Sequence, residues 1–440
     1  MARPIGIDLF AGVGGLSLGF EQAGFDVVAA VEIDPIHAAA HKFNFPECTV
    51  IPSSVVGLSG GEIRTIARIG NRKVAVVFGG APCQGFSLIG QRALDDPRNS
   101  LVKEFVRIVG ELEASYFVFE NVKGLTVGRH KKFLEEVIEE FKSLGYNVRM
   151  PWRVLNAAHF GTPQDRERVI LFGARIGLPL PEYPSRSTRA AGADQNEIDA
   201  KEGPSVKDAL SDIPNADDYV DLVESDSVRT TRWGRPSLFA REMRCLENDA
   251  WHFGYVRNWD PSILTASMRT GHSSISKRRF AETAPGTIEP ISRFFKLSEN
   301  GVSNTLRAGT DSARGAFTSP RPIHYQYPRC VTVREMARLH GFPDWFRFHE
   351  TKWHGARQIG NAVPPPLARE VANSVMRAIG IKPERPHGSI GLGDPNLLRM
   401  DISKAAKFWG VPVTIGRRDR KSGARKRSQE EIEALRLALE

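Results

Sequence analysis

Two explanations fit a cysteine in the first third of the chain: packing in the core and chemical reactivity. Cys83 lies in "GGAPCQGFS" (79–87), behind Pro82 and after the valine-rich run "VAVVFGG" (74–80). Such an apolar run is typical of a strand buried on both faces, and in open α/β sheets ligands bind beyond the carboxyl ends of such strands. Free cysteine is also among the most buried residue types. Cys83 is therefore either a small core residue or a nucleophile held at the end of a strand.

Three charged residues follow later apolar segments. Glu120 stands in "FENV" (119–122), where it ends a strand-like run. A carboxyl group leaving an apolar strand has its pKa raised by desolvation, so Glu120 either stays protonated and donates or is an ordinary strand-end acid in water. Arg166 and Arg168 in "QDRERV" (164–169) are two residues apart and share one side of an extended chain, a pattern that surface charge also explains.

A glycine-rich segment and a distant acid indicate a binding site for a nucleoside. "DLFAGVGGLSLGF" (8–20) runs from a strand through a glycine turn into a helix, and such a turn exposes backbone N–H groups. It is not the dinucleotide fingerprint, because Ser17 stands where the third glycine would fall. Glu32 lies 20 residues after Gly12, at the end of the second predicted strand, where a carboxylate can accept hydrogen bonds from ribose hydroxyls. We therefore favour a nucleoside cofactor over a mere tight turn.

The elements that must position these residues alternate along residues 1–180. Short apolar runs predict strands in "IGIDLF", "VVAAVEI", "VAVVFGG", "YFVFENV" and "RVILFGA". Between the last two, residues 131–145 place their apolar side chains on one helical stripe. Strands and helices in alternation imply an α/β fold, with a mainly parallel sheet covered by helices on both faces.

The pattern changes further along the chain. Between about 182 and 320, proline, glycine, serine and arginine interrupt every periodicity, so we expect a separate, irregular domain. Thr332 and Glu335 then have the spacing of a capping box at the start of a helix. Another helix is expected after "GNAVPPP" (360–366), an unusual sequence for a surface linker. After Gly380, a proline- and glycine-rich linker leads into a basic tail.

Composition places the chain among ordinary globular proteins of the cytoplasm. Hydrophobic residues make up 41% and charged residues 25%, and no apolar run approaches the ~20 residues of a membrane span. The first ten residues lack a signal-peptide core, so we expect no membrane partner. The four cysteines form no close pair for a metal site, and a reducing compartment suits them. The net charge of +9 fits a polyanionic partner, although a mild arginine excess is common elsewhere.

Taken in order, six segments resemble the motifs of the DNA (cytosine-5)-methyltransferase family. They are the glycine loop, "APCQGFS", "ENV", the Gln-x-Arg-x-Arg element, "RCVTVREMARLHGFP" and "GNAVPPP". Together they span residues 8 to about 375, with a variable region where the family places target recognition. One such motif is weak support, whereas six in the family's order exclude coincidence.

The resemblance implies a Rossmann-like S-adenosylmethionine-dependent methyltransferase sheet with an inserted small target-recognition domain. The catalytic domain would then comprise residues 1–180 and 325–383, and the target-recognition domain residues 181–324. Residues 384–440 would be a linker and a basic tail. Within the inserted region, base-edge contacts are expected from polar and arginine side chains such as Arg269, Thr270, Lys277 and Arg307.

The resemblance also assigns roles in catalysis. Cys83 would attack carbon 6 of a cytosine as a thiolate, and Glu120 would hold or protonate ring nitrogen 3 and contact the exocyclic amine. Arg168, together with Arg166, would grip the base oxygen and brace Glu120. Asn121 would orient the loop that carries the cysteine. Carbon 5 would then take the methyl group before elimination releases Cys83, and the base must be flipped out of the duplex.

For S-adenosylmethionine, the resemblance implies a site built from both ends of the chain and no metal. Phe10 would lie against the adenine, the glycines would give backbone room, Glu32 would hold the ribose and Asn361 would close the methionine pocket. The complete set is Phe10, Ala11, Gly12, Gly14, Gly15, Leu16, Glu32, Ile33, Pro82, Asn361 and Ala362. One position departs from the family: Ser53 and Ser54 stand where an aspartate usually bonds the adenine amino group.

The expected function is methyl transfer to carbon 5 of cytosine in a specific sequence of double-stranded DNA. We expect a cytoplasmic monomer that serves a restriction-modification system, with a cognate endonuclease as its partner. Two alternatives are a methyltransferase acting on cytosine in RNA and a non-catalytic DNA-binding regulator that kept the fold. A regulator has no use for a nucleophile, an acid and two arginines together.

The tail contains a stretch that resembles a helix-turn-helix. In "DISKAAKFWGVPVTIGRR" (401–418), Ala405, Ala406 and Phe408 would form the inner face of a first helix and Gly410 the turn. Seven of the eleven residues from 417 to 427 are Lys or Arg. The tail is therefore expected to be either a small DNA-binding element or a disordered basic extension.

Overall fold

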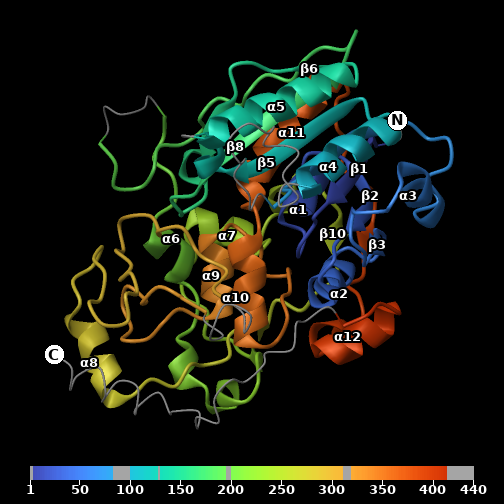
Figure 1. The fold of residues 1–440 in the computed structure, drawn as a ribbon. Coiled ribbons are helices and arrows are strands. Elements are labelled where there is room, and N and C mark those ends of the chain that lie inside the picture. The colour runs from blue at the N-terminus through green and yellow to red at the C-terminus, as the bar shows by residue number, and fades with distance from the viewer. Residues whose placement is uncertain (1–2, 83–99, 127–128, 195–199, 311–318, 414–440) are drawn as a thin grey trace, which may run out of the picture.

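The fold is built on one sheet of eight strands (Figure 1). Most of the candidate residues lie at one end of its strands. The structure is a computed structural model that describes residues 3–82, 100–126, 129–194, 200–310 and 319–413. The strand order is β3-β2-β1-β4-β5-β8-β6, and β7 also pairs with β8. The strands are β1 (Ile5–Leu9), β2 (Asp26–Val31), β3 (Thr49–Ile51), β4 (Val74–Gly79), β5 (Tyr116–Val122), β6 (Tyr146–Val148), β7 (Arg153–Asn156) and β8 (Glu167–Arg175).

The expected parallel sheet is found in the first five strands. All pairings among β1 to β5 are parallel, whereas β8 pairs antiparallel with β5, β6 and β7. From β1 the chain proceeds outward through β2 and β3, then returns to place β4 on the other side of β1. This reversal makes the β1–β4 junction a topological switch point, the place where open α/β sheets bind ligands.

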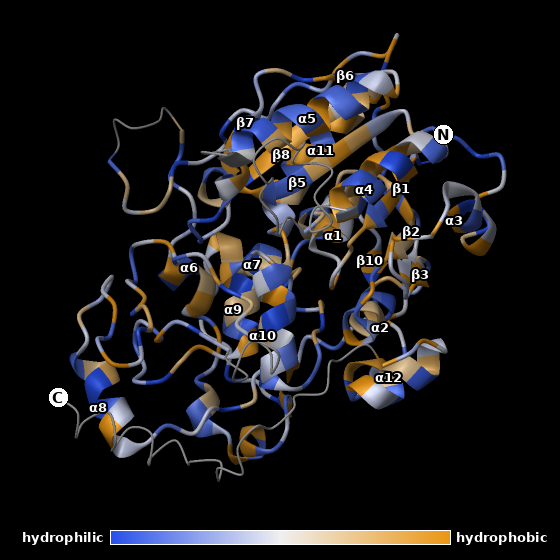
Figure 2. Ribbon diagram, in the orientation of Figure 1, coloured by the Kyte–Doolittle hydropathy of each residue, from blue (hydrophilic) through white to orange (hydrophobic). Residues whose placement is uncertain are grey.

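Helices cover both faces of the sheet, as the alternation predicted. On one face, α3 (Gly60–Ile66), α4 (Ser100–Glu111) and α5 (Arg129–Ser143) share an apolar core with the strands. Figure 2 shows the alternation of hydrophilic and hydrophobic residues along α5, as expected for a helix buried on one side. On the other face, α1 (Gly15–Gln22) and α11 (Pro365–Ile379) form a second core with the strands.

The two ends of the chain meet in the pair of α1 and α11. A Cβ added at Gly19 would lie 2.3 Å from the Cβ of Ala368, so the absence of a side chain there allows the close approach of the helices. α11 begins in the prolines that follow α10 (Lys352–Asn361), at the helix expected after "GNAVPPP". Figure 1 accordingly shows α11, from the C-terminal part of the chain, among the N-terminal elements.

The region from about 182 to 320 contains short elements joined by irregular segments. They are α6 (Val206–Leu210), α7 (Leu238–Met243), α8 (Ser274–Glu282), β9 (Val228–Arg229), β10 (Val256–Arg257) and β11 (Ile263–Leu264), besides short 3₁₀ turns. Its apolar residues share a third core with α9 (Val333–Leu339), α10 and α2 (Pro35–Asn44). The expected capping box at the start of α9 is confirmed, because Thr332 and Glu335 bond reciprocally to each other's backbone N–H. The domain boundaries given above remain predictions.

Part of the segment after residue 384, which was expected to be a linker, is folded against the rest of the protein. β12 (Ser389–Ile390) pairs in parallel with β10, Leu397 and Leu398 are buried, and α12 (Ile402–Trp409) packs beside α2. Proline and glycine here shape a docked segment rather than a free connection. In the part of the chain that the structure describes, no helix combines the length and apolar character needed to span a membrane.

Candidate active site

Glu120 and Arg168 come together on adjacent strands beside the switch point. Glu120 lies near the carboxyl end of β5 and Arg168 near the start of β8, and the register pairs Glu120 with Ile170. Arg168 is two residues from that partner, so both side chains project from the same face. The Nε of Arg168 lies 2.7 Å from Oε1 of Glu120, and both side chains are almost buried. The two residues therefore form one charged unit.

The acid of this pair has the shifted pKa that its place in the sequence suggested. Burial raises the pKa of Glu120 above its ordinary value, and the positive charges of Arg168 and Arg166 oppose only part of this effect. The carboxyl group therefore keeps a proton to higher pH than an exposed glutamic acid does. A group of this kind can donate a hydrogen bond to a ring nitrogen.

The loop after β4 lies directly against this acid. A Cβ added at Gly80 would lie 2.4 Å from Oε2 of Glu120, so a glycine is needed for the approach. The Nδ2 of Asn121 donates a hydrogen bond to the carbonyl oxygen of Ala81 at 2.9 Å. This is the contact expected of Asn121, and it positions the backbone before Pro82, which is exposed. Cys83 itself lies outside the described residues.

Arg166 has a different task from the one its spacing suggested. Its side chain is 1% exposed, and its guanidinium donates to the carbonyl oxygens of Leu306 (2.8 Å), Gly360 (2.7 Å) and Ala362 (2.9 Å). These bonds hold a segment of the inserted region and the Asn361 turn against the start of β8. The charge of Arg166 still lowers the pKa of Glu120, but its Nη groups bind backbone. It is therefore a positioning residue.

The segment around Leu306 is fastened to the strand end by further bonds. Gln164 accepts from the backbone N–H of Leu306 at 3.1 Å, and Asp165 donates its N–H to Ser303 at 2.8 Å. Gly360 has room for this segment only because it lacks a Cβ, which would lie 2.3 Å from the nitrogen of Ala308. The sequence alone did not predict this contact, because no local pattern connects residues 140 positions apart.

The glycine loop and Glu32 form a second polar corner at the same end of the sheet. Oε2 of Glu32 accepts the N–H of Gly12 at 2.7 Å, and Oε1 accepts the N–H of Asp34 at 2.8 Å. Burial raises the pKa of this carboxyl group as well. Each carboxylate oxygen still has a lone pair for another donor. The corner can thus accept two vicinal hydroxyl groups, as a ribose presents them.

The glycines of the loop serve two purposes. A Cβ at Gly12 would meet no atom of the described residues within 4 Å, so in the described structure this side of the loop is open to a ligand. At Gly14 a Cβ would lie 2.4 Å from the ring of Phe45, and at Gly15 it would lie 2.4 Å from the carbonyl oxygen of Val363. Gly14 and Gly15 are therefore required by packing within the protein. Phe10, Gly12 and Gly14 all have positive φ, which turns the loop sharply.

The remaining residues expected to bind the cofactor differ in how exposed they are. Ala11 and Leu16 are buried, Phe10 is partly buried, and Ile33 and Asn361 are exposed. Ala362 is nearly buried, and its carbonyl oxygen accepts from Arg166 and contacts His340. The set therefore offers a carboxylate, an open glycine turn and exposed apolar side chains, which fit an adenosyl group. Ser54 accepts the N–H of Val56 at 3.1 Å, so its hydroxyl group closes its own turn.

The residues expected to read DNA bases are divided between internal and exposed positions. Arg269 pairs with Asp217, and Thr270 accepts from Arg321 at 2.7 Å, so both are tied within the protein. Lys277 and Arg307 are exposed. They remain the better candidates of the four for contact with a polyanion.

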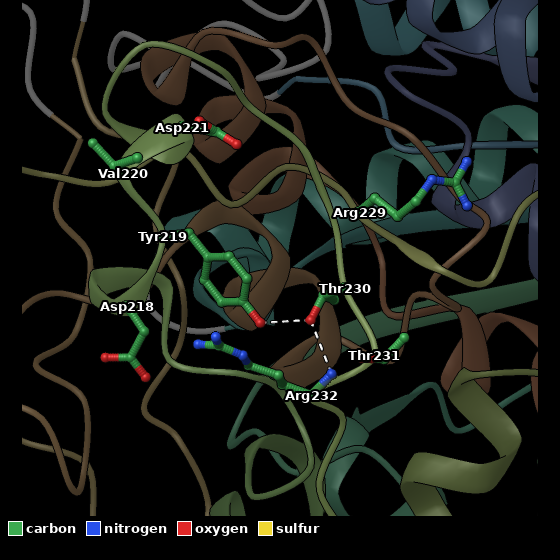
Figure 3. A pocket seen from close by; sticks show the side chains of 8 residues that line it. All are labelled: Asp218, Tyr219, Val220, Asp221, Arg229, Thr230, Thr231 and Arg232. Atoms are coloured by element: carbon green, nitrogen blue, oxygen red, sulfur yellow. Dashed lines mark hydrogen bonds between the residues drawn. The ribbon is translucent and has the colours of Figure 1, made fainter.

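A polar hollow of about 310 Å³ lies elsewhere in the inserted region. Its lining consists of residues 218–221 and 229–232, none of which is a predicted site residue. Figure 3 shows the hydroxyl group of Tyr219 turned toward Thr230, and the two oxygens lie 2.5 Å apart. The guanidinium of Arg232 lies 5.7 Å from the centre of the Tyr219 ring. The hollow therefore offers a stacked aromatic group and charges of both signs.

Comparison with known proteins assigns this geometry to a family. A family model described as C-5 cytosine-specific DNA methylase matches residues 6–377. The chain belongs to this family. The described residues of three motifs identified above, the glycine loop, "ENV" and the Gln-x-Arg-x-Arg element, lie at the end of the sheet where β1 and β5 finish and β8 begins. The protein is a DNA (cytosine-5)-methyltransferase with the S-adenosylmethionine-dependent methyltransferase fold. This result confirms the predicted enzyme class and fold class.

Individual relatives are similar over most of their length. The type II methyltransferase M.XorII of Xanthomonas oryzae pv. oryzae is 58% identical over 421 residues, which are 96% of either chain. M1.HphI of Haemophilus parahaemolyticus, also a type II methyltransferase, is 34% identical over 84% of this chain and 86% of that one. A solved structure of a putative prophage-encoded DNA modification methyltransferase (E. coli) gives a TM-score of 0.67 at 30% identity, covering 86% of this chain and all of that one. The match to M.XorII extends past residue 377, where the family model ends.

Proposed function

We propose that this methyltransferase adds a methyl group to carbon 5 of a cytosine flipped out of a specific duplex DNA sequence, with Cys83 as nucleophile. The observation that supports this most is the Glu120–Arg168 pair, which lies against the loop leading to Cys83. A carbon within the base stack is out of reach of any side chain, so the target must leave the duplex.

The chemistry proceeds by covalent catalysis. The Cys83 thiolate adds to carbon 6 of cytosine, and Glu120 donates a hydrogen to ring nitrogen 3 as electron density moves toward carbon 5. Burial raises its pKa, which favours the protonated form that this step requires. Arg168 holds the carboxyl group in place and contacts the base oxygen. Carbon 5 then gains the methyl group and loses its hydrogen to a base, and the carbon–sulfur bond breaks.

S-Adenosylmethionine is the proposed methyl donor, and when bound it supplies an electrophilic methyl group. Glu32 accepts hydrogen bonds from its ribose, and the open side of Gly12 admits it to the loop. Phe10 and Ile33 flank the adenine, and the Asn361 turn, held by Arg166, closes the other end. Ser54 stands where the family's adenine-binding aspartate is expected, and its hydroxyl oxygen accepts the N–H of Val56 within its own turn.

The biological setting is inferred from the relatives. M.XorII and M1.HphI are named type II methyltransferases, which supports a role in restriction-modification beside an endonuclease for the same sequence. We propose a cytoplasmic monomer that reads duplex DNA through the inserted region. The exposed Lys277 and Arg307 and the Tyr219–Arg232 hollow are the candidate reading elements.

Expression in a host free of DNA methylation tests this proposal. Bisulfite sequencing of the host DNA should show protected cytosines at one recurring sequence. A matched host expressing Cys83→Ala should show none. Protected cytosines in RNA, with none in DNA, would contradict the proposal and favour the RNA alternative.

A further inference from the structure

The C-terminal segment 389–410 lies beyond the family match, and it contacts both ends of helix α2. Near the C-terminal end of α2, the N–H of Gly393 donates to the carbonyl oxygen of Phe43 at 2.8 Å. At the N-terminal end, the indole Nε1 of Trp409 donates to the carbonyl oxygen of Pro35 at 3.1 Å. Figure 1 shows α12, near the red end of the colour scale, directly beside the blue α2. The segment thus clamps α2 along its length.

This segment is a built part of the fold. Asp401 caps α12 by accepting the N–H of Lys404, and Gly410 ends the helix in the left-handed conformation. Ala405 and Ala406 are buried, so the face expected to pack within a helix-turn-helix is covered where α12 meets α2. Phe408, expected on that same face, is instead 53% exposed. The first helix of the expected element is thus committed to the methyltransferase core.

On its other side, the segment contacts the inserted region and Glu350, which lies two residues before α10. β12 pairs with β10, which belongs to the inserted region. The N–H of Glu350 donates to Leu398 at 3.0 Å, and Arg399 pairs with Glu350 at 2.7 Å. These attachments give the clamp a rigid base.

The N-terminal end of α2, which Trp409 contacts, also holds Glu32, the acid proposed to bind the ribose. Asp34 caps α2 by accepting the N–H groups of Ile36 and His37. Its own N–H donates to Glu32, whose second oxygen accepts Gly12. Because the first turn of a helix has no intrahelical partners for its N–H groups, its position depends on such contacts. A shift of Pro35 would therefore move Asp34 and with it the carboxylate of Glu32.

We propose that segment 389–410 is a brace for the cofactor corner and that Trp409 is its positioning residue. The brace keeps Glu32 where the nucleoside hydroxyl groups meet it, and so it sets the affinity for S-adenosylmethionine. This inference rests on the proposed cofactor site. Trp409 does not touch the cofactor in this scheme; it acts through Pro35 and Asp34.

Binding of S-adenosylhomocysteine to the full-length protein, measured by calorimetry without DNA, tests the brace. Trp409→Phe keeps a smaller aromatic ring but removes the hydrogen bond, and we expect it to raise Kd about threefold. Trp409→Ala should raise Kd about tenfold. Lys407→Ala, on the same helix with an exposed side chain, is the matched control and should leave Kd unchanged. At saturating cofactor both Trp409 variants should keep wild-type kcat, so that the loss appears in KM for the cofactor.

The outcomes separate the brace from the site it serves. Glu32→Ala should abolish binding; if it binds like the wild type, the cofactor corner itself is misassigned. If Glu32→Ala loses binding while both Trp409 variants bind like the wild type, the brace is refuted and the cofactor site stands. An equal loss in Lys407→Ala and Trp409→Phe also refutes it, because that result would indicate general loosening of α12. Melting temperatures of all variants identify any that fail to fold.

Discussion

Arg166 and Leu306 are joined by a hydrogen bond of 2.8 Å from the guanidinium Nη1 to the carbonyl oxygen, across 140 positions of the chain. The same guanidinium also holds Gly360 and Ala362. One buried side chain thus ties the inserted region and the Asn361 turn to the strand that carries Arg168.

Replacing this arginine should weaken the fold and the reaction together. Lysine at position 166 cannot reach three carbonyl oxygens in fork geometry, and it leaves buried acceptors unpaired. We expect Arg166→Lys to lower the free energy of unfolding by roughly 3 kcal/mol in urea titrations, with a clear loss of kcat. Arg175→Lys, at the exposed end of the same strand, is the control and should change stability by less than about 0.5 kcal/mol. Equal stability of both variants would contradict the role of Arg166.

Removal of the proposed nucleophile should stop methyl transfer without unfolding the protein. Cys83→Ala deletes one sulfur atom, so we expect wild-type cofactor binding but no transfer to DNA. A duplex containing 5-fluorocytosine should trap the wild-type protein as a covalent adduct, because fluorine cannot leave as a proton does. Mass spectrometry should locate the adduct at Cys83. Turnover within a few-fold of wild type in Cys83→Ala would sink the assignment.

A buried acid below the glycine loop should make stability depend on pH. Burial raises the pKa of Asp8 to about 8 from 3.8, although a hydrogen bond from Ser17 at 2.6 Å opposes this. Between these two values the native state binds more protons than the unfolded chain, so stability falls as pH rises. Relative to Asp8→Asn, the wild type should lose up to about 1.4 kcal/mol per pH unit from pH 4 to 8.

Urea titrations of both proteins at pH 5, 7 and 9 measure this difference. The asparagine variant keeps the shape of the side chain but cannot ionise, so it isolates the titration of Asp8. A difference in unfolding free energy that does not vary with pH would show that Asp8 is already ionised in the native state.

Base reading is expected at Arg307 rather than at the internal Arg269. Arg307 is exposed, and its backbone packs on Gly360 beside the Asn361 turn. If it reads a base, Arg307→Ala should relax one position of the recognised sequence at a cost of roughly 1–3 kcal/mol. Competition binding with duplexes altered at single positions measures this. A uniform loss over all duplexes would identify a phosphate contact instead.

The basic tail should contribute affinity without specificity. Because residues 389–410 are docked, the informative deletion starts after Val413, in the tail that holds the seven basic residues between 417 and 427. We expect the methylated sequence to stay the same. The salt dependence of DNA binding should flatten by up to ~0.9 in slope for each phosphate that the tail had neutralised. An unchanged slope would rule out a DNA-binding tail of either kind.

Local patterns predicted five of the eight strands and the residues from which the candidate site is proposed. Short apolar runs predicted β1, β2, β4, β5 and β8, and the apolar stripe of residues 131–145 predicted α5. Strands β3, β6 and β7 were missed because three or four residues are too few to show a period. Glu120 and Glu32 were singled out because one lies near the end of a buried strand and the other directly follows one, and the pKa of each carboxyl group is raised by burial.

What the sequence by itself determined is therefore what neighbours along the chain decide: strands, helices, caps, and acids at strand ends. Only the tertiary structure decided the tasks of Arg166, Gly80 and Trp409, because each depends on atoms far away in the chain. Arg166 and Arg168 look alike in sequence, yet one meets backbone carbonyl oxygens and the other a carboxylate. Tertiary packing brings those partners together. The spacing of residues along the chain does not predict which distant segment will contact each arginine.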